Sequence, residues 1–478
     1  MESIKKISIL YYAFFVFICC TIAAIYYNSI SIILLPFIPL VLAAAFSYYK
    51  LIWLVLLATI PFAFEYNITN TLGLDMPDEP LMLLVTGIFL LLVFTKSIQI
   101  PKALWTNKII LILVLMYIWY GVTSAASSFP LYSFKYMLAK VWYIIPFTLL
   151  PTVLLQTKKD FKLVAYCVAI PLVVTVLIIL YKHYSRGFLF DNINTAVAPY
   201  YRNHVTYAAL LVSVMPIVVS IYIGVAKMYK KYVLLVIVIL LVALFLSYSR
   251  GAWLALVVGL VSVVLVKKGW LLLSFISVML LIVGITIWLS GNNKYIQYHP
   301  NYRKTIYHAN LSDHINATFA GTDMSNAERI NRWIAGVRMA DENKLFGFGP
   351  NTFYHNYKPY MVTYFKTWVS DNKEKSTVHN YFLLTLIEQG WVGLLLLLSL
   401  ISLTMYRLQQ LYKRVTDTFC QKIILCVTAM LSIILTLNML SDLVETDKIG
   451  SLYYLCIGLT IWLHLKHPTP LPTESQLQ

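Results

Sequence analysis

Charged residues are scarce in this chain, and acidic residues are the scarcest of them. Only 12% of the 478 residues are charged, and 20 Asp and Glu stand against 37 Lys and Arg. A soluble domain carries about 25% charged residues, so the composition excludes that class. With 60% hydrophobic residues and a mean hydropathy of +0.75, the sequence predicts an all-α protein that crosses a membrane many times.

The chain also lacks metal ligands in a usable arrangement. The six cysteines are Cys19, Cys20, Cys167, Cys420, Cys426 and Cys456. All of them fall in apolar segments or on the side assigned below to the cytoplasm, so we expect no external disulfide and no zinc site. No external connection carries an Asp-x-Asp pair. The sequence therefore predicts neither a metal ion nor another cofactor.

Apolar runs long enough to cross a ~30 Å hydrocarbon core as helices are the dominant feature. They begin near Ile7, Ser31, Leu51, Leu81, Ile109, Phe134, Phe161, His204, Tyr232, Ala252, Trp270, Asn380, Lys422 and Ser451. We expect about 12 to 14 transmembrane helices, in an N-terminal bundle over residues 1–290 and a C-terminal group over residues 380–466. Between them, residues 291–379 form one large polar loop with short helices. Residues 467–478, with three prolines, are expected to be a disordered tail.

Lysine and arginine fall in every second connection between the apolar runs. The pattern extends from Lys50 to Arg414, whereas the intervening connections are nearly free of lysine and residues 65–79 are acidic. Because cytoplasmic loops carry the basic excess, both termini are predicted in the cytoplasm and residues 291–379 on the external face. The net charge of +17 then reflects topology and contact with anionic lipids, and not binding to nucleic acid.

Two arginine-containing segments stand at external ends of apolar runs. Arg250 lies in Ser-Arg-Gly between two such runs; it either closes a tight hairpin as an interfacial anchor or holds an anion at the membrane surface. Arg202 and His204 flank Asn203 at a helix entrance. This cluster is either part of the aromatic and basic membrane border or a polar binding site.

The large loop contributes two further candidates. Residues 327–340 have helical periodicity with an apolar side at Ile330, Trp333, Ile334, Val337 and Met339. Arg329 and Arg332 share a face of this helix, where they form either a clamp for a diphosphate or a solvated basic surface. His379 stands at the external start of an apolar helix, whose dipole disfavours imidazolium. A neutral ring there can accept a proton, so His379 is a candidate general base.

Taken together, these segments resemble the O-antigen ligase and O-antigen polymerase superfamily of bacterial inner-membrane glycosyltransferases. The matching motifs are Ser-Arg-Gly at residues 249–251, the helix and Gly-Phe-Gly-Pro-Asn turn up to residue 351, His379-Asn380, and Glu-x-Gly-x-x-Gly beginning at Glu388. They occur in the order typical of the family, and the resemblance covers roughly residues 200–400. It implies a GT-C-like helical membrane fold with the active site facing the periplasm.

The resemblance also implies an activity and its participants. Members transfer a glycan from an undecaprenyl diphosphate carrier to an acceptor hydroxyl, without a metal ion and with inversion. By similarity His379 is the base, Arg250 with Arg329 or Arg332 holds the diphosphate, and Arg202 assists. His204, Asn380 and Glu388 are possible supporting residues.

Acceptors in the superfamily are lipid A core, a second lipid-linked glycan, or a protein hydroxyl. We favour a ligase of lipopolysaccharide biosynthesis, with lipid A core as acceptor, because a single histidine stands beside paired arginines. A transporter for lipid-linked glycans is the competing class, although the sequence shows no repeat symmetry and Glu388 is almost the only acidic residue within a span.

Overall fold

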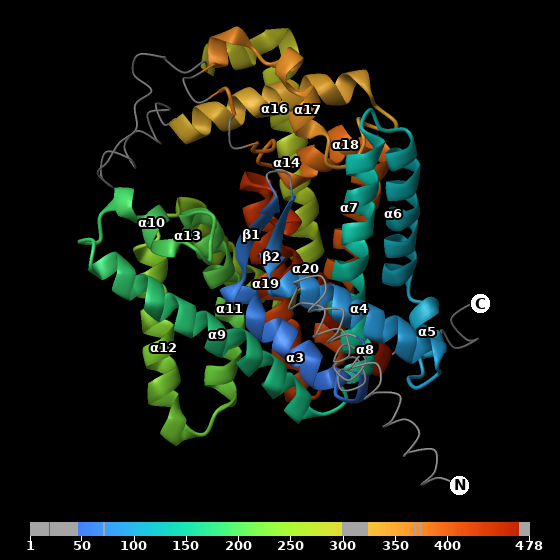
Figure 1. The fold of residues 1–478 in the computed structure, drawn as a ribbon, viewed down its shortest axis with the longest axis vertical. Helices are drawn as coiled ribbons and strands as arrows, with labels where there is room; N and C mark the ends of the chain where they lie inside the picture. The colour runs from blue at the N-terminus through green and yellow to red at the C-terminus, as the bar shows by residue number, and fades with distance from the viewer. Residues whose placement is uncertain are drawn as a thin grey trace.

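The protein is a bundle of membrane-length helices with a small segment of short helices at one end (Figure 1). This segment, the described part of residues 291–379, is called the external segment after its predicted side of the membrane. A computed structural model describes residue 19 and residues 46–69, 72–298, 324–366, 370–372 and 375–467. Within these ranges ten helices are long and apolar enough to cross a membrane. The predicted class, an all-α polytopic membrane protein, is confirmed.

The ten candidate spans start close to the positions predicted from Ile109 onward. They are α6 (Lys108–Ala125), α7 (Pro130–Ile144) continued by η3 (Ile145–Leu149) and α8 (Leu150–Leu154), α9 (Lys158–Tyr184), α11 (His204–Gly224), α12 (Lys227–Phe245), α13 (Arg250–Lys268), α14 (Leu271–Ser290), α18 (Tyr381–Arg414), α19 (Thr418–Leu440) and α20 (Asp447–Lys466). Helix α20 lies at the centre, with 89% of its span buried in protein, whereas α14 is 11% buried and lies at the edge of the bundle.

The N-terminal part differs from the prediction. The starts expected near Ile7 and Ser31 lie outside the described residues. Near Leu51, α3 (Tyr49–Thr59) and η2 (Ile60–Phe62) form an apolar helix shorter than the ~20 residues that a span needs. Helix α4 (Asp78–Phe94) and the short α5 (Lys102–Trp105) follow.

The acidic external connection forms a small sheet that the sequence patterns did not indicate. Strands β1 (Phe64–Thr69) and β2 (Leu72–Met76) pair antiparallel, with Phe64 opposite Met76. Nearby, the buried ammonium of Lys448 in the first turn of α20 donates to the carbonyls of Ile60 and Ala63, at 2.8 and 2.9 Å. The chain that leads into the hairpin is thereby fixed to the end of the central helix.

Basic connections gather on one side of the bundle. Lys50 pairs with Asp160 at 2.5 Å, and Lys158 lies 3.6 Å from Asp417. The ammonium of Lys413, at the end of α18, lies against Gly269 in the α13–α14 connection. The other end of the long helix α18 meets the external segment, so the basic side and the external segment lie at opposite ends of the bundle (Figure 1).

The described elements of the external segment are η5 (Gly291–Tyr298), α16 (Met324–Glu342), α17 (Phe353–Asn356), η6 (Lys358–Tyr360) and η7 (Thr363–Phe365). Helices α16 and α17 pack on α18. The connection before α11 forms η4 (Phe190–Asn192) and α10 (Ile193–Val197), and α10 packs on α9 and α11. The last short 3-10 helix of the chain, η8 (Leu443–Glu445), joins α19 to α20.

The helix predicted over residues 327–340 exists as α16, and its apolar side is mostly only partly buried. Of the expected apolar side only Met339 is buried, whereas Glu328, Asn331 and Arg332 are buried with the small residues around them. The reason is close packing on α18, where a Cβ on Gly336 would come within 2.8 Å of Ile387. Small side chains allow this approach, and the polar ones on the same face line a site.

A backbone joint fixes the Gly-Phe-Gly-Pro turn to a kink in α18. The kink is at Gly390, where φ is +66° and a Cβ would lie 2.1 Å from the Leu345 carbonyl oxygen. The amides of Phe348 and Gly349 donate to carbonyls of α18 at 3.0 and 2.9 Å, and Trp391 N–H donates back to Lys344 O at 2.8 Å. Because a residue with a side chain would not fit at the kink, glycine is required there.

Candidate functional site

A pocket of about 190 Å³ lies where the external segment meets the ends of the membrane helices. It is lined by Asn203, Val205, Thr206, Glu328, Arg329, Arg332, His379, Ser441 and Leu443. These residues come from the first turn of α11, from α16, from the chain before α18 and from the α19–α20 connection. The pocket is smaller than the roughly 300 Å³ of a site that encloses a whole small molecule, so it suits one end of a larger substrate.

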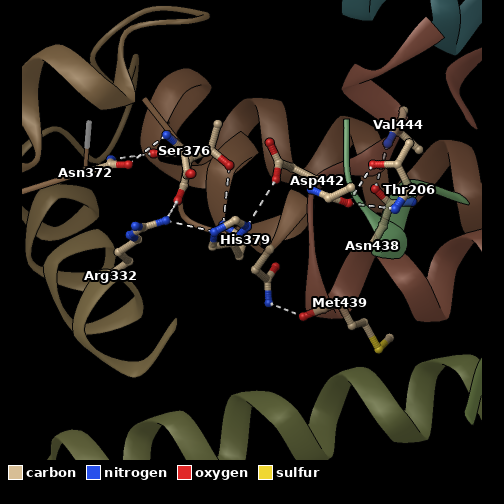
Figure 2. Close-up of polar contacts among 12 residues, drawn as sticks. Thr206, Arg332, Asn372, Ser376, His379, Asn438, Met439, Asp442 and Val444 are labelled. Atoms are coloured by element: carbon tan, nitrogen blue, oxygen red, sulfur yellow. Dashed lines mark hydrogen bonds and ion pairs between the residues drawn. The ribbon is translucent and has the colours of Figure 1, made fainter. Parts of the chain in front are cut away.

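The predicted base His379 is held in this pocket by its neighbours in the chain. Val378 is fully buried in the core beneath α16, and Asn380 caps α18 by accepting from Leu383 N–H at 3.0 Å. The amide of Asn380 also donates to Met439 O at 3.1 Å, which ties the start of α18 to the end of α19 (Figure 2). His379 has a φ of +55°, a region that residues other than glycine rarely adopt. Such backbone strain is common at functional sites.

Arg332 contacts the ring of His379 directly. Its Nη1 lies 2.8 Å from Nε2 of His379 and 3.2 Å from Thr377 O (Figure 2). A guanidinium has only donors, so Nε2 must accept and carries the lone pair. The ring proton therefore sits on Nδ1.

That Nδ1 faces a carboxylate which the sequence analysis missed. Asp442, just after α19, places Oδ1 3.9 Å from Nδ1 of His379 (Figure 2). Asp442 lies in the short connection between α19 and α20, on the predicted external side. A carboxylate in that connection was the only feature of the sequence that could have indicated its role. Histidine is thus flanked by an arginine on one nitrogen and an acid on the other, which is the arrangement of an oriented base.

The surroundings keep His379 neutral. Burial, together with the positive charges of Arg332, Arg329 and Arg202, lowers the pKa of His379 to about 3. Burial raises the pKa of Asp442. The Thr377 hydroxyl and the charge of Arg332 act in the opposite direction, because both favour the ionised carboxylate. The ring is therefore unprotonated at neutral pH.

Positive charge converges on the pocket from several elements. Arg329 and Arg332 line it, and Arg202 is close enough to act on His379. The N-terminus of α11 also faces it, with Asn203 capping Thr206 N–H at 2.9 Å. Helix N-termini carry a partial positive charge, so the pocket is suited to an anion.

Arg250 does not line the pocket but begins α13 beside it. The first turn of α13 lies against Leu440, the last residue of α19, and the next residue, Ser441, lines the pocket. The structure thus brings three of the four predicted arginines around His379, and it places the start of α13, where Arg250 lies, against the end of α19.

The remaining predicted supporting residues have other contacts. His204 turns its Nδ1 to Asn194 Oδ1 at 2.9 Å and thereby holds the α10 segment. Glu388 accepts the amides of Asn351, Thr352 and Phe353 at 2.8 to 3.0 Å, so it anchors the start of α17. Both hold the scaffold around the pocket. Among the residues that the structure describes, no group of three or more His, Cys, Asp or Glu is placed to hold a metal ion.

Glu328 is a charged pocket residue that the sequence analysis did not select. It is buried, accepts from Ser370 Oγ at 2.7 Å, and has Oε2 3.8 Å from Nη2 of Arg332. The i, i+4 spacing from Glu328 to Arg332 was a signal for this ion pair, since such residues share a helix face.

Comparison with known proteins identifies one matching family. The model of the family described as O-antigen ligase matches residues 235–398, from α12 into α18. The matched region contains Arg250, Arg329, Arg332 and His379. No curated protein matches the chain. The resemblance drawn from the motifs is confirmed over these residues, which match the O-antigen ligase family, whose members are glycosyltransferase-like enzymes.

Proposed function

We propose that the protein transfers a glycan from an undecaprenyl diphosphate carrier to an acceptor hydroxyl on the periplasmic face of a bacterial inner membrane. The observation that carries the proposal is the neutral His379 between Arg332 and Asp442, in a pocket surrounded by arginines. The reaction inverts the anomeric carbon and uses guanidinium groups, without a metal ion, to stabilise the leaving diphosphate.

Recognition of the donor rests on its diphosphate. Arg329 and Arg332 supply planar donors that match phosphate oxygens, and the α11 N-terminus adds backbone N–H groups. The pocket is about 190 Å³, so it takes the diphosphate and the adjoining anomeric centre while the lipid and the rest of the glycan remain outside. A membrane-embedded carrier delivers such a head group to the external ends of the helices.

The chemical step follows from the protonation state of His379. Nε2 accepts the proton of the acceptor hydroxyl while the oxygen attacks the anomeric carbon from the side opposite to the diphosphate. The bond from that carbon to the diphosphate oxygen breaks, and its electron pair leaves with the diphosphate. The arginines stabilise the charge that develops there, and Asp442 stabilises the imidazolium.

Lipid A core is the acceptor that we propose, because a single histidine beside paired arginines supports the ligase reaction. A second lipid-linked glycan or a protein hydroxyl would use the same base and the same leaving group. Enzymes that use each of these three acceptors occur in the same superfamily, so the acceptor must be established by assay.

The test uses purified protein in nanodiscs with an undecaprenyl-diphosphate-linked oligosaccharide, and lipid A core, a second lipid-linked glycan and a peptide as separate acceptors. His379→Ala should lower the transfer rate by about 10²- to 10⁴-fold, the usual contribution of a general base, and leave donor binding intact. His355→Ala is the matched control, since His355 is an external histidine packed between Phe129 and Tyr132.

Two results would overturn the proposal. One is a His379→Ala protein that transfers glycan at a tenth of the normal rate or better. The other is wild-type protein that moves the donor across the membrane and transfers it to none of the three acceptors, which would identify a transporter.

A further inference from the structure

Arg332 donates a hydrogen bond to Nε2 of His379, the atom through which a general base would accept a proton. In the Nδ1–H tautomer, the Nε2 lone pair is the only proton-accepting position of the ring, and Nη1 of Arg332 donates to it at 2.8 Å. An acceptor hydroxyl cannot use the same lone pair while this hydrogen bond is present. In this structure Arg332 therefore covers Nε2 of His379.

The guanidinium of Arg332 is held in place by contacts with other residues. Glu328, one turn earlier on α16, has Oε2 3.8 Å from Nη2 of Arg332, while Oε1 accepts from Ser370 at 2.7 Å. The carbonyl of Thr377 accepts from Nη1 at 3.2 Å. Arg332 is thus fixed at Nη2 by a carboxylate and at Nη1 by two neutral acceptors.

We propose that Arg332 is a removable cap on the base, that Glu328 positions this cap, and that the donor diphosphate draws the guanidinium off Nε2 of His379. This inference rests on the proposed function, because it assumes that His379 is the base and that a diphosphate binds here. It adds that the base is free only in the donor complex.

The competition between the two acceptors favours the diphosphate. Hydrogen bonds between a guanidinium and a phosphate are charge-assisted on both sides and can be bidentate, whereas imidazole offers one neutral nitrogen. Only Nη1 has to move, since the contact of Nη2 with Glu328 can act as the pivot. A side-chain rotation is therefore sufficient to uncover Nε2.

Removal of the cap also strengthens the base. A ring held neutral by burial and three arginines is a poor proton acceptor, because general bases work best with a pKa near the working pH. The diphosphate neutralises the arginines and so raises the pKa of His379 at the stage when a proton must be taken. The cap also makes binding ordered, since an acceptor hydroxyl finds no free Nε2 before the donor is bound.

The test is site-resolved acylation by diethyl pyrocarbonate, which attacks an imidazole nitrogen with a free lone pair. The full-length protein is treated with and without farnesyl diphosphate, and modification of His379 is followed by mass spectrometry with His355 as the internal reference. Farnesyl diphosphate should accelerate acylation of His379 by about tenfold, the factor for release of one charge-assisted hydrogen bond, and leave His355 unchanged. An unchanged or slower rate at His379 overturns the proposal without recourse to any variant.

Variants separate the cap from its positioning residue. Arg332→Gln should be acylated rapidly at His379 even without ligand, and Glu328→Gln should shift the ligand-free rate in the same direction. Arg338→Gln is the matched control, because Arg338 is exposed on α16 and contacts Tyr295 and Tyr360 instead. A wild-type rate in ligand-free Arg332→Gln contradicts the cap, and a wild-type rate in Glu328→Gln contradicts the positioning role.

Failure of this proposal and failure of the proposed function give different results. If acylation responds to farnesyl diphosphate but His379→Ala still transfers glycan, the cap exists and His379 is not the base. If His379→Ala abolishes transfer but acylation ignores the ligand and Arg332, His379 is the base and the cap is wrong.

Discussion

Replacing Asp442 by asparagine tests whether the acid beside His379 contributes to the reaction. In the structure Oδ1 of Asp442 lies 3.9 Å from Nδ1 of His379, on the side of the ring opposite to Arg332. When the ring takes a proton it becomes positive, and the carboxylate then stabilises it. Asparagine keeps the shape of the side chain and removes the charge, so the donor site around the arginines is unaltered.

The size of the effect follows from the distance. Two unit charges about 4 Å apart attract by about 4 kcal/mol at an effective dielectric constant of about 20. If about half of the proton has moved in the transition state, the loss is about 2 kcal/mol, a fall of about 30-fold in kcat. The KM for the donor should stay the same, since an interaction made only in the transition state lowers kcat alone.

The assay is transfer from the lipid-linked oligosaccharide at saturating acceptor, with Asp341→Asn as the matched control. Asp341 is an exposed acid on α16 that pairs with Lys344 at 2.9 Å, so its loss changes the external charge equally without touching the pocket. A kcat for Asp442→Asn within about twofold of wild type, or a change in KM alone, would refute the role assigned to this carboxylate.

Three other results are expected. Because the pKa of His379 in the free enzyme is lowered to about 3, the base form persists as the pH falls, so kcat/KM for the donor should show no acid limb near pH 6.5; an inflection between about pH 6 and 7 would contradict this. Gly390→Ala should destabilise the fold by about 3 kcal/mol or more, because the new Cβ would clash with Leu345 O and φ is positive. The measurement is the Tm in detergent. Gly284→Ala is the control and should leave the Tm nearly unchanged, because no atom lies within 4 Å of the new Cβ. A cysteine placed at Lys358 should react with an impermeant reagent in intact spheroplasts, and its protection would reverse the topology.

Hydrophobic length predicted the spans well because burial in lipid acts on each segment separately. The starts predicted from Ile109 to Ser451 each correspond to an observed helix. Helix α16 shows the limit of such patterns. Its apolar residues mark one side of the helix, yet the polar Glu328 and Arg332 are more deeply buried than most of them, because the helix approaches α18 closely at small residues such as Gly336. Only tertiary packing determines that choice.

The candidate site was predicted in part for the same reason. His379 was identifiable because it directly precedes an apolar helix, a property of its own neighbourhood in the sequence. Asp442 reaches His379 only because α18 and α19 run side by side and bring their external ends together, as the contact of Asn380 with Met439 shows. No pattern near Asp442 contains that information.

The joint between the external segment and α18 keeps the geometry of the site independent of most side chains in the external segment. It consists of main-chain hydrogen bonds at Phe348, Gly349 and Trp391 together with the carboxylate of Glu388, so few side chains determine its geometry. The outward-facing residues of α16 and α17 can therefore diverge to fit different acceptors while His379 keeps its position. Under the proposed function, this joint allows the same active-site geometry to serve glycans of many structures, provided that the kink at Gly390 is retained.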